Sequence, residues 1–355
     1  MTQMTTQTPP AATRTPHTPA ARGLSIEHLD CRLDLTYNWG YGETRKELRD
    51  LYHKAKRSQW IPERTLPWDT SVDLARPAIA EEYFPLYGSD LWARLGEREK
   101  INLGNEVLSW LLSQFLHGEQ GALLAATQLV ASVPDLDSKY YASTQVMDEA
   151  RHVEVYDRYL HEKIGFSYPI SPYLKTLLDL ILKDVRWDMK LLGMQIMVEG
   201  LALAAFHMIH DQTTEPLLKD LTHYVMLDEA RHVAYGVLSL QDYYQDMKES
   251  ERREREDFVY EAAVLMRDRF LFQQVWEKIG FPVATCTEIV MNSMPQQMFR
   301  QLLFSKVVPA IKRIGLLSDR QRERFHALGI LQFESWADPF DDLARDRAAP
   351  LPAAA

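Results

Sequence analysis

Asp-Glu-Ala-Arg-His-Val occurs twice in this sequence, as residues 148–153 and again, 80 positions later, as residues 228–233. Each copy contains the motif Glu-x-x-His, which pairs Glu149 with His152 and Glu229 with His232. On a helix, residues i and i+3 lie on one face, so the two side chains of each pair can reach a single metal ion. One such pair is a weak signal, whereas two copies in apolar helical surroundings are a strong one.

A further glutamate precedes each motif by 30 residues and interrupts an apolar run. Glu119 lies in the apolar stretch 108–124, and Glu199 lies in the apolar stretch 194–206. The order along the chain is therefore Glu, Glu-x-x-His, Glu, Glu-x-x-His, which is the ligand set of a four-helix bundle that binds two iron or manganese ions. The shared offset of 80 residues predicts a pseudo-twofold bundle built from two helix pairs.

The four glutamates in an apolar interior need positive charge close to them, because an unpaired buried carboxylate costs several kcal/mol or takes up a proton. The alternative is that each one pairs with an arginine or lysine, and Arg151 and Arg231 are available. Two divalent metal ions, however, would supply all four positive charges. Mixed carboxylate and imidazole donors also suit iron or manganese better than structural zinc.

The residues that flank these ligands recur in register. Asp148 and Asp228 precede the two motif glutamates, and Arg151 and Arg231 precede the two histidines. A metal-bound histidine usually donates its second ring N–H to a carboxylate that fixes the ring. These four residues are therefore predicted to surround the ligands, the alternative being charge on a solvated helix surface.

The pattern resembles the ferritin-like di-iron carboxylate superfamily over about residues 100–245. It is most similar to the hydroxylase subunits of bacterial multicomponent monooxygenases and to the acyl-carrier-protein desaturases. The resemblance implies two iron ions that activate O2, or a mixed Mn/Fe pair, with one or more glutamates bridging the metals. It implies Glu119, Glu149 and His152 around one ion, and Glu199, Glu229 and His232 around the other.

The chain departs from two relatives of this superfamily. The p-aminobenzoate N-oxygenases carry an additional histidine four residues before the second Glu-x-x-His, where this chain has Val225. His223 is a poor substitute, because it lies about 120° around the helix from Glu229. The small subunit of ribonucleotide reductase typically has aspartate where this chain has Glu119, and it carries a tyrosine in its C-terminal tail, whereas no tyrosine or tryptophan follows Trp336 here.

Composition restricts the class of protein. The chain has 355 residues, enough for one large or two smaller cores, and a formal net charge of −10 without a basic stripe, so nucleic acid is not an expected partner. Cys31 and Cys286 are the only cysteines, which argues against a disulfide scaffold or zinc ribbon and favours a reducing cytosol. No membrane span is expected, since Glu199 interrupts the longest apolar run.

Helical periodicity predicts an all-α fold, a ferritin-like four-helix bundle with additional helices at both ends. Residues 1–22 and 343–355 are predicted to be disordered tails, and residues 23–342 one domain with its bundle core at about 97–247. The helices are expected over residues 43–59, 71–83, 97–132, 137–164, 174–210 with a break near Gly193, 215–247, 250–279, 285–314 and 318–328.

Seven residues beyond each motif glutamate, the symmetry ends, with Tyr156 after one and Gly236 after the other. Tyr156 occupies the position of the radical tyrosine in ribonucleotide reductase small subunits, although a packed tyrosine is the simpler interpretation. Gly236 either opens space beside the second metal or allows a close helix crossing. The inward faces, which include Phe115 and Ala122, are typical of a plain core. Beside a centre that activates O2 they would also form an apolar pocket, with Gln145 and Gln195 as its polar residues.

The leading hypothesis is a cytoplasmic oxygenase that uses O2 to oxidise a small organic substrate, free or tethered to a carrier. No glycine motif for flavin or nicotinamide is present, so an external ferredoxin or flavoprotein reductase is implied. The alternatives are a radical-generating subunit or Mn/Fe oxidase, supported by Tyr156, and an iron-storage protein, disfavoured by a chain about twice the size of a minimal ferritin bundle. Related proteins are often dimers, so a homodimer is compatible with the resemblance.

Overall fold

The computed structural model describes residues 26–337. The chain divides into two units between Asp30 and Cys31, and residues 26–30, the described part of the first unit, form no helix or strand. The described part of the second unit, residues 31–337, contains helices and no strand, which confirms the all-α prediction. The tails predicted at residues 1–22 and 343–355 lie outside the described residues, and the single domain over 23–342 stays a prediction.

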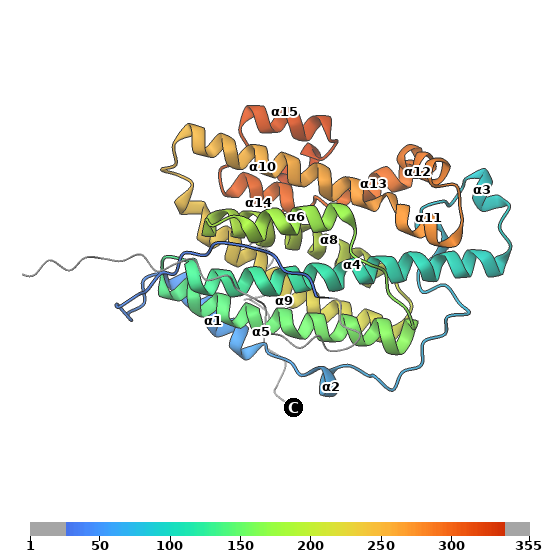
Figure 1. The fold of residues 1–355 in the computed structure, drawn as a ribbon, viewed down its shortest axis with the longest axis horizontal. Coiled ribbons are helices and arrows are strands. Elements are labelled where there is room, and N and C mark those ends of the chain that lie inside the picture. Colours follow the sequence, from blue (N-terminus) through green and yellow to red (C-terminus); the bar gives the residue numbers. More distant parts are fainter. Residues whose placement is uncertain (1–25, 338–355) are drawn as a thin grey trace, which may run out of the picture. The chain divides into compact units, whose positions relative to one another are not determined.

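Four long helical segments form the bundle (Figure 1). They are α4 (Glu97–Ser132), α5 (Leu136–Tyr159), a composite of α7 (Trp187–Leu191), η3 (Leu192–Val198) and α8 (Glu199–Gln212), and α9 (Pro216–Tyr243). Helix α4 packs along α5, α8 packs along α9, and α5 also contacts α9. The chain therefore forms the two helix pairs that the repeated motif predicts.

Local sequence explains where two of the bundle helices begin. The Asp135 carboxylate accepts a hydrogen bond from Ser138 N at the start of α5. At the start of α9, Glu215 accepts from Leu217 N and Leu218 N, and Pro216 occupies the first turn, where no N–H is required. These caps set the register of the two motifs along their helices.

The other helices surround the bundle. They are α1 (Lys46–Arg57), α2 (Pro62–Thr65), η1 (Glu81–Tyr83), α3 (Asp90–Ala93), η2 (Leu160–Ile164), α6 (Pro172–Lys183), α10 (Glu249–Asp268), η4 (Arg269–Leu271), α11 (Gln273–Ile279), α12 (Val283–Asn292), α13 (Met294–Leu302), α14 (Val307–Arg313), α15 (Asp319–Ala327) and η5 (Leu331–Ser335). Helix α1 packs on α5 and α9, whereas α6, α10 and α14 contact η3. The third bundle segment is thus covered by α6, which precedes it in the chain, and by α10 and α14, which follow it.

Three of the predicted helices are interrupted, and one does not form. No helix covers residues 71–80, where Pro77 restricts the residue before it, and only η1 follows. The segment 285–314 is divided into α12, α13 and α14, with Pro295 just after the first break. In the segment 250–279, α10 ends at Asp268 and α11 begins at Gln273. Phe272, immediately before α11, has a left-handed φ of 55°.

The third bundle segment breaks before Gly193 rather than at it. Helix α6 ends at Lys183, and the buried Lys190 donates to the carbonyl oxygens of Ile181 and Leu182, which closes the end of that helix. Gly193 instead lies inside η3, a π-helical stretch that leads directly into Glu199. π-helical turns are rare and frequently mark functional sites.

Gly236 marks a close helix crossing and not an open space. A Cβ atom at this position would lie 2.8 Å from Gln195 Cβ and 3.0 Å from Ile196 Cδ1, both in η3. The hypothesis that Gly236 opens room beside a metal is therefore wrong, and the alternative of a close helix crossing holds. The absence of a side chain lets α9 approach the π-helical segment.

The run Trp187–Gln212 is long and apolar enough to cross a membrane by length and composition. Within its most apolar window, 83% is buried inside the protein. Its hydrophobic character therefore matches its place in the bundle core, where it also carries Glu199.

The crossing at Gly236 can be tested by two matched glycine substitutions. Gly236→Ala should lower the free energy of unfolding by about 1–3 kcal/mol relative to Gly118→Ala, because added volume in a packed contact is destabilising. A Cβ at Gly118, also helical, meets no atom within 4 Å. Both variants gain the same helix propensity, so the difference between their unfolding curves isolates the clash. Equal stability of the two variants would contradict the close crossing.

Candidate metal centre

The six side chains predicted as ligands lie together in the bundle core, where all are buried. They form two overlapping groups, Glu119 with Glu149, His152 and Glu229, and Glu149 with Glu199 and His232. Within each group, one potential ligand atom from every residue lies within 4.8 Å of the others. Glu149 belongs to both groups.

Glu149 and Glu229 both lie between the two histidines. His152 Nδ1 is 3.4 Å from Glu149 and 3.2 Å from Glu229, whereas His232 Nδ1 is 3.2 Å from Glu149 and 3.5 Å from Glu229. Glu119 is 3.3 Å from His152 Nδ1, and Glu199 is 4.0 Å from His232 Nδ1. The arrangement thus has two central and two outer carboxylates, related by the pseudo-twofold symmetry of the chain.

Each imidazole is held by an aspartate from the opposite helix. His152 Nε2, on α5, donates to Asp228 Oδ2 on α9 over 3.1 Å, and His232 Nε2 donates to Asp148 Oδ2 on α5 over 3.3 Å. Because an ionised carboxylate can only accept, these bonds place an N–H on Nε2 of each ring. Nδ1 of each ring faces the glutamates, and it would lose any proton it carries when a metal ion binds there.

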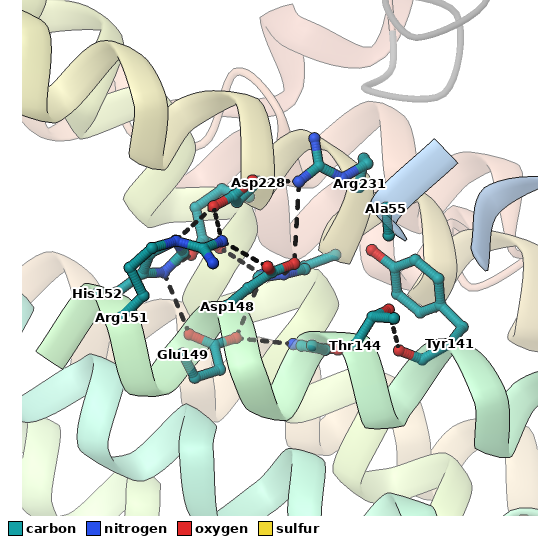
Figure 2. Close-up of polar contacts among 12 residues, drawn as sticks. Ala55, Tyr141, Thr144, Asp148, Glu149, Arg151, His152, Asp228 and Arg231 are labelled. Atoms are coloured by element: carbon teal, nitrogen blue, oxygen red, sulfur yellow. Dashed lines mark hydrogen bonds and ion pairs between the residues drawn. The ribbon is translucent and has the colours of Figure 1, made fainter. Parts of the chain in front are cut away.

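The two arginines complete this layer of side chains. Arg151 donates to Asp148 and, over 2.7 Å, to Asp228, while Arg231 donates to Asp228 (Figure 2). All four residues are buried, so the alternative of a solvated charged surface is wrong. Figure 2 shows Arg151 lying beside both aspartates, between the two motif helices.

Two residues that sequence reasoning missed also belong to this layer. Gln59 Nε2 donates to Asp148 over 2.7 Å and its Oε1 accepts from Arg151, while Trp60 Nε1 donates to Asp228 over 2.8 Å. The Arg151 guanidinium lies over the Trp60 ring, 4.7 Å from its centroid. Both residues follow α1 and are remote in sequence from the motifs, so no spacing rule could have found them.

The charges of the core are balanced only in part by protein groups. Burial, together with the Glu229 carboxylate, raises the pKa of Glu119 well above its usual range, and burial with the same neighbour raises that of Glu199. Burial also opposes ionisation of Glu149, but the two histidines outweigh it and lower its pKa. The surrounding carboxylates raise the pKa of both histidines despite burial. Protons would therefore be retained here in the absence of another positive charge.

Several core atoms have no hydrogen-bond partner among the described residues. They are Glu149 Oε2, Glu199 Oε2, both carboxylate oxygens of Glu229, and His232 Nδ1. Buried polar atoms are rarely left unpaired in proteins, and each such atom requires an explanation. Carboxylate oxygens and an imidazole nitrogen directed at a common point form a donor set that fits two iron or manganese ions.

Gln145 and Gln195 hold the carboxylates in place. Gln145 Nε2 donates to both Glu149 Oε1 and Glu199 Oε1 over 2.9 Å, and Gln195 Nε2 lies 3.4 Å from Glu199 Oε1. The two glutamines therefore contact glutamates of the cluster, and their predicted role in a substrate pocket stays a prediction.

Tyr156 is fully buried, its ring stacks on Phe206, and its hydroxyl has no partner among the described residues.

A small cavity adjoins the cluster on the side of α4 and α8. Its volume is about 20 Å³, which is room for a single water molecule. Its walls are formed by Gln114, Phe115, Gly118, Glu119, Ala122, Val198, Glu199, Ala202, Glu229 and Arg269. Phe115 and Ala122 lie on the predicted inward face of α4, whereas Arg269 was not anticipated.

The sequence matches the family model described as "P-aminobenzoate N-oxygenase AurF" over residues 42–315. The chain belongs to this family. This is a ferritin-like di-iron N-oxygenase family, so the predicted superfamily is confirmed. The matched residues include all six clustered side chains. Within the superfamily, the family that matches is the N-oxygenases, whereas the motifs had been compared most closely with the monooxygenase hydroxylases and desaturases.

At residue 225 this chain differs from the histidine pattern expected for the N-oxygenases. Val225 is fully buried in α9, where the pattern of those relatives has an additional histidine. His223 lies outside both groups, and its ring is 5.8 Å from that of His210 and 5.4 Å from that of Tyr224. This member of the family therefore carries two histidines in the cluster.

Solved structures that are similar to this chain include R2-like ligand-binding oxidases. One, described with an aerobically reconstituted metal cofactor after photoconversion, is 17% identical, covers 76% of this chain and 93% of its own, and has a TM-score of 0.48. Another, described with an aerobically reconstituted Mn/Fe cofactor, is 16% identical over 76% and 93% with a TM-score of 0.46. No match was found among curated proteins.

The aspartates that hold the histidines should influence metal affinity. We expect Asp228→Ala to weaken Fe(II) binding by roughly 10–100-fold, since loss of such a partner frees the His152 ring and leaves two arginines less well paired. Asp220→Ala removes an exposed aspartate from the same helix and serves as the control. Metal titration and thermal unfolding should be measured together, and unchanged affinity in a folded Asp228→Ala protein would contradict the role.

Proposed function

We propose that this protein is a dinuclear metal oxygenase that uses O2 to oxidise a small organic substrate at an amine nitrogen. The observation that carries the proposal is the pair of overlapping groups of buried, unpaired carboxylate and imidazole donors. Membership of an N-oxygenase family supports nitrogen as the reacting atom. Bound in the reduced state, two iron ions, or a manganese and an iron ion, would supply electrons to O2 and the oxidising power for the substrate.

The protein groups would hold and orient this centre. Glu149 would be shared by the two metals and Glu229 would lie between them, with Glu119 and His152 on one side and Glu199 and His232 on the other. The resemblance left open which glutamates are shared, and the distances from Glu229 to both histidines support its central place. Asp148, Asp228, Arg151 and Arg231 would keep the imidazoles oriented, and the dry core would exclude bulk water.

The reaction needs an electron source outside this chain. Insertion of one oxygen atom into an N–H bond consumes O2, two electrons and two protons and yields a hydroxylamine and water. A separate ferredoxin or flavoprotein reductase would supply the electrons. We further propose a cytosolic location, consistent with two cysteines that form no disulfide.

The shared position of Glu149 makes a quantitative prediction about metal content. Glu149→Ala should abolish binding of both metal ions, whereas Glu119→Ala should lose one of them, because only Glu149 belongs to both groups. Metal analysis of protein reconstituted anaerobically with Fe(II) should give about two ions per chain for the wild type. Glu154→Ala, at an exposed site on α5, is the control. Two metal ions retained in Glu149→Ala would refute the assignment.

A second candidate function, radical generation, is favoured by one observation. The hydroxyl of Tyr156 is buried without a partner among the described residues, and burial, with the charges of Glu119 and Glu229, raises its pKa. These neighbours place the hydroxyl near the metal cluster. A tyrosine so placed could be oxidised instead of a substrate.

Removal of one hydroxyl separates the two functions. An oxygenase should retain O2 consumption within about twofold in Tyr156→Phe, because the change removes no metal ligand. Tyr141→Phe removes another buried, unpaired hydroxyl and is the matched control. Stopped-flow oxygen consumption and electron paramagnetic resonance should be recorded for both variants. Lost activity together with a lost organic radical signal, in Tyr156→Phe alone, would favour radical generation.

A further inference from the structure

A second cavity lies among the later helices, apart from the metal cluster. Its volume is about 440 Å³, which is within the range of about 300–1,000 Å³ that is usual for small-molecule sites. Helices α10, α12 and α13, the turn η4, and the segment between α15 and η5 contribute to its walls. It shares no lining residue with the cavity beside the glutamates. A molecule bound here would therefore not touch the candidate metal ligands.

Two arginines line this cavity, and only one of them has an acidic partner. Arg267 donates to Asp268 over 2.6 Å, and both residues line the cavity. Arg300 is 8% exposed and makes no ion pair with a described residue. Its hydrogen bonds among the described residues run to the carbonyl oxygens of Val290 and Met291, at 3.5 and 3.4 Å, which are long for such bonds. Two arginines and one aspartate leave the lining with one positive charge in excess.

This excess charge is held at an electrostatic cost. Burial lowers the pKa of Arg300, the charge of Arg267 lowers it further, and Asp268 opposes these effects only in part. A buried charge without a hydrogen-bonded ionic partner is strongly destabilising. The chain as a whole has a formal net charge of −10, yet no second acidic side chain lines this cavity. An anion bound in the cavity would supply the missing partner.

Much of the remaining wall is apolar. Leu271 comes from η4, and Leu328 and Ile330 come from the segment between α15 and η5. Gly329 has a left-handed φ of 72°, and a Cβ atom there would collide with Nε2 of Gln301, another lining residue. Glycine thus lets this segment close against the cavity. Because an inorganic ion would leave the apolar atoms uncovered, a matching ligand has an aliphatic portion beside its charge.

We propose that this cavity binds a singly charged aliphatic carboxylate, with its carboxylate on Arg300 and its chain against Leu271, Leu328 and Ile330. A guanidinium presents two parallel N–H groups that match a carboxylate in one plane. One negative charge matches the one positive charge in excess. Asp268, already paired with Arg267, would repel a second negative charge, so a monocarboxylate fits better than a phosphate dianion or a dicarboxylate. The inference does not rest on the proposed function, since the two sites share no residue.

Binding of hexanoate to the full-length, metal-loaded protein tests this site, with hexanamide as the neutral isostere. Isothermal titration calorimetry should show hexanoate bound to the wild type, and hexanamide and inorganic phosphate bound at least about tenfold more weakly. Arg300→Met should weaken hexanoate binding at least about tenfold, because it removes the charge and its N–H groups but keeps a long side chain. Arg267→Met should weaken it as well, because the lining then has no excess charge. Arg253→Met changes an exposed arginine of α10 outside the cavity and is the control.

The same measurements separate this site from the metal centre and from a structural role. Hexanoate held by metal ions would keep its affinity in both cavity variants and lose it in metal-free protein, whereas the proposed site should bind equally with and without Fe(II). If Arg300 only capped the carbonyl end of α12, Arg300→Met would lower the melting temperature and leave hexanoate affinity unchanged.

Either of these results would overturn the proposal, as would hexanamide or phosphate binding as tight as hexanoate, or wild-type protein that binds no hexanoate. Arg267 is partly exposed, so Arg267→Met keeps the test decisive if Arg300→Met does not fold. Failure of the metal assignment would appear separately, as wild-type protein that binds hexanoate but no metal.

Discussion

The whole bundle depends on the charge of its buried carboxylates. Four glutamates and two aspartates are buried around two arginines and two histidines, so the arginines balance only two of the six acidic groups. The raised pKa values of Glu119 and Glu199 show that protons would be retained to make up part of the difference. Two divalent ions would remove the need for these protons, which explains why so apolar a core tolerates so many acids.

The repeated motif acts between helices more than along them. Asp148 holds His232, Asp228 holds His152, and Arg151 contacts both aspartates. Each copy of the motif thus supplies candidate ligands to the centre and an aspartate that holds the histidine of the other copy. Because neither copy is complete alone, substitution at one aspartate affects the opposite histidine, and the two helices must pack in one register for the ligands to converge.

Sequence predicted the parts of the site that obey a period. The six clustered glutamates and histidines, the flanking aspartates and arginines, and helix α4 from residue 97 to 132 all follow from helical spacing. Gln59, Trp60 and Arg269 could not be found in this way, because tertiary packing alone brings them to the site. The π-helical stretch at Gly193 was mistaken for a break, since a glycine there signals equally a weak helix or a close contact.

The chain departs from twofold symmetry where substrate would enter. Gln145 bonds Glu149 and Glu199 on one face of the cluster, and Gly236 is closed by Gln195 and Ile196 of η3. The cavity reaches Glu119, Glu199 and Glu229 but not Glu149. This cavity lies on the side of α4 and α8, and its wall holds Arg269 in addition to the three glutamates. A symmetric scaffold can hold two metals equally, whereas a cavity on one side of the cluster gives a bound molecule a single direction of approach.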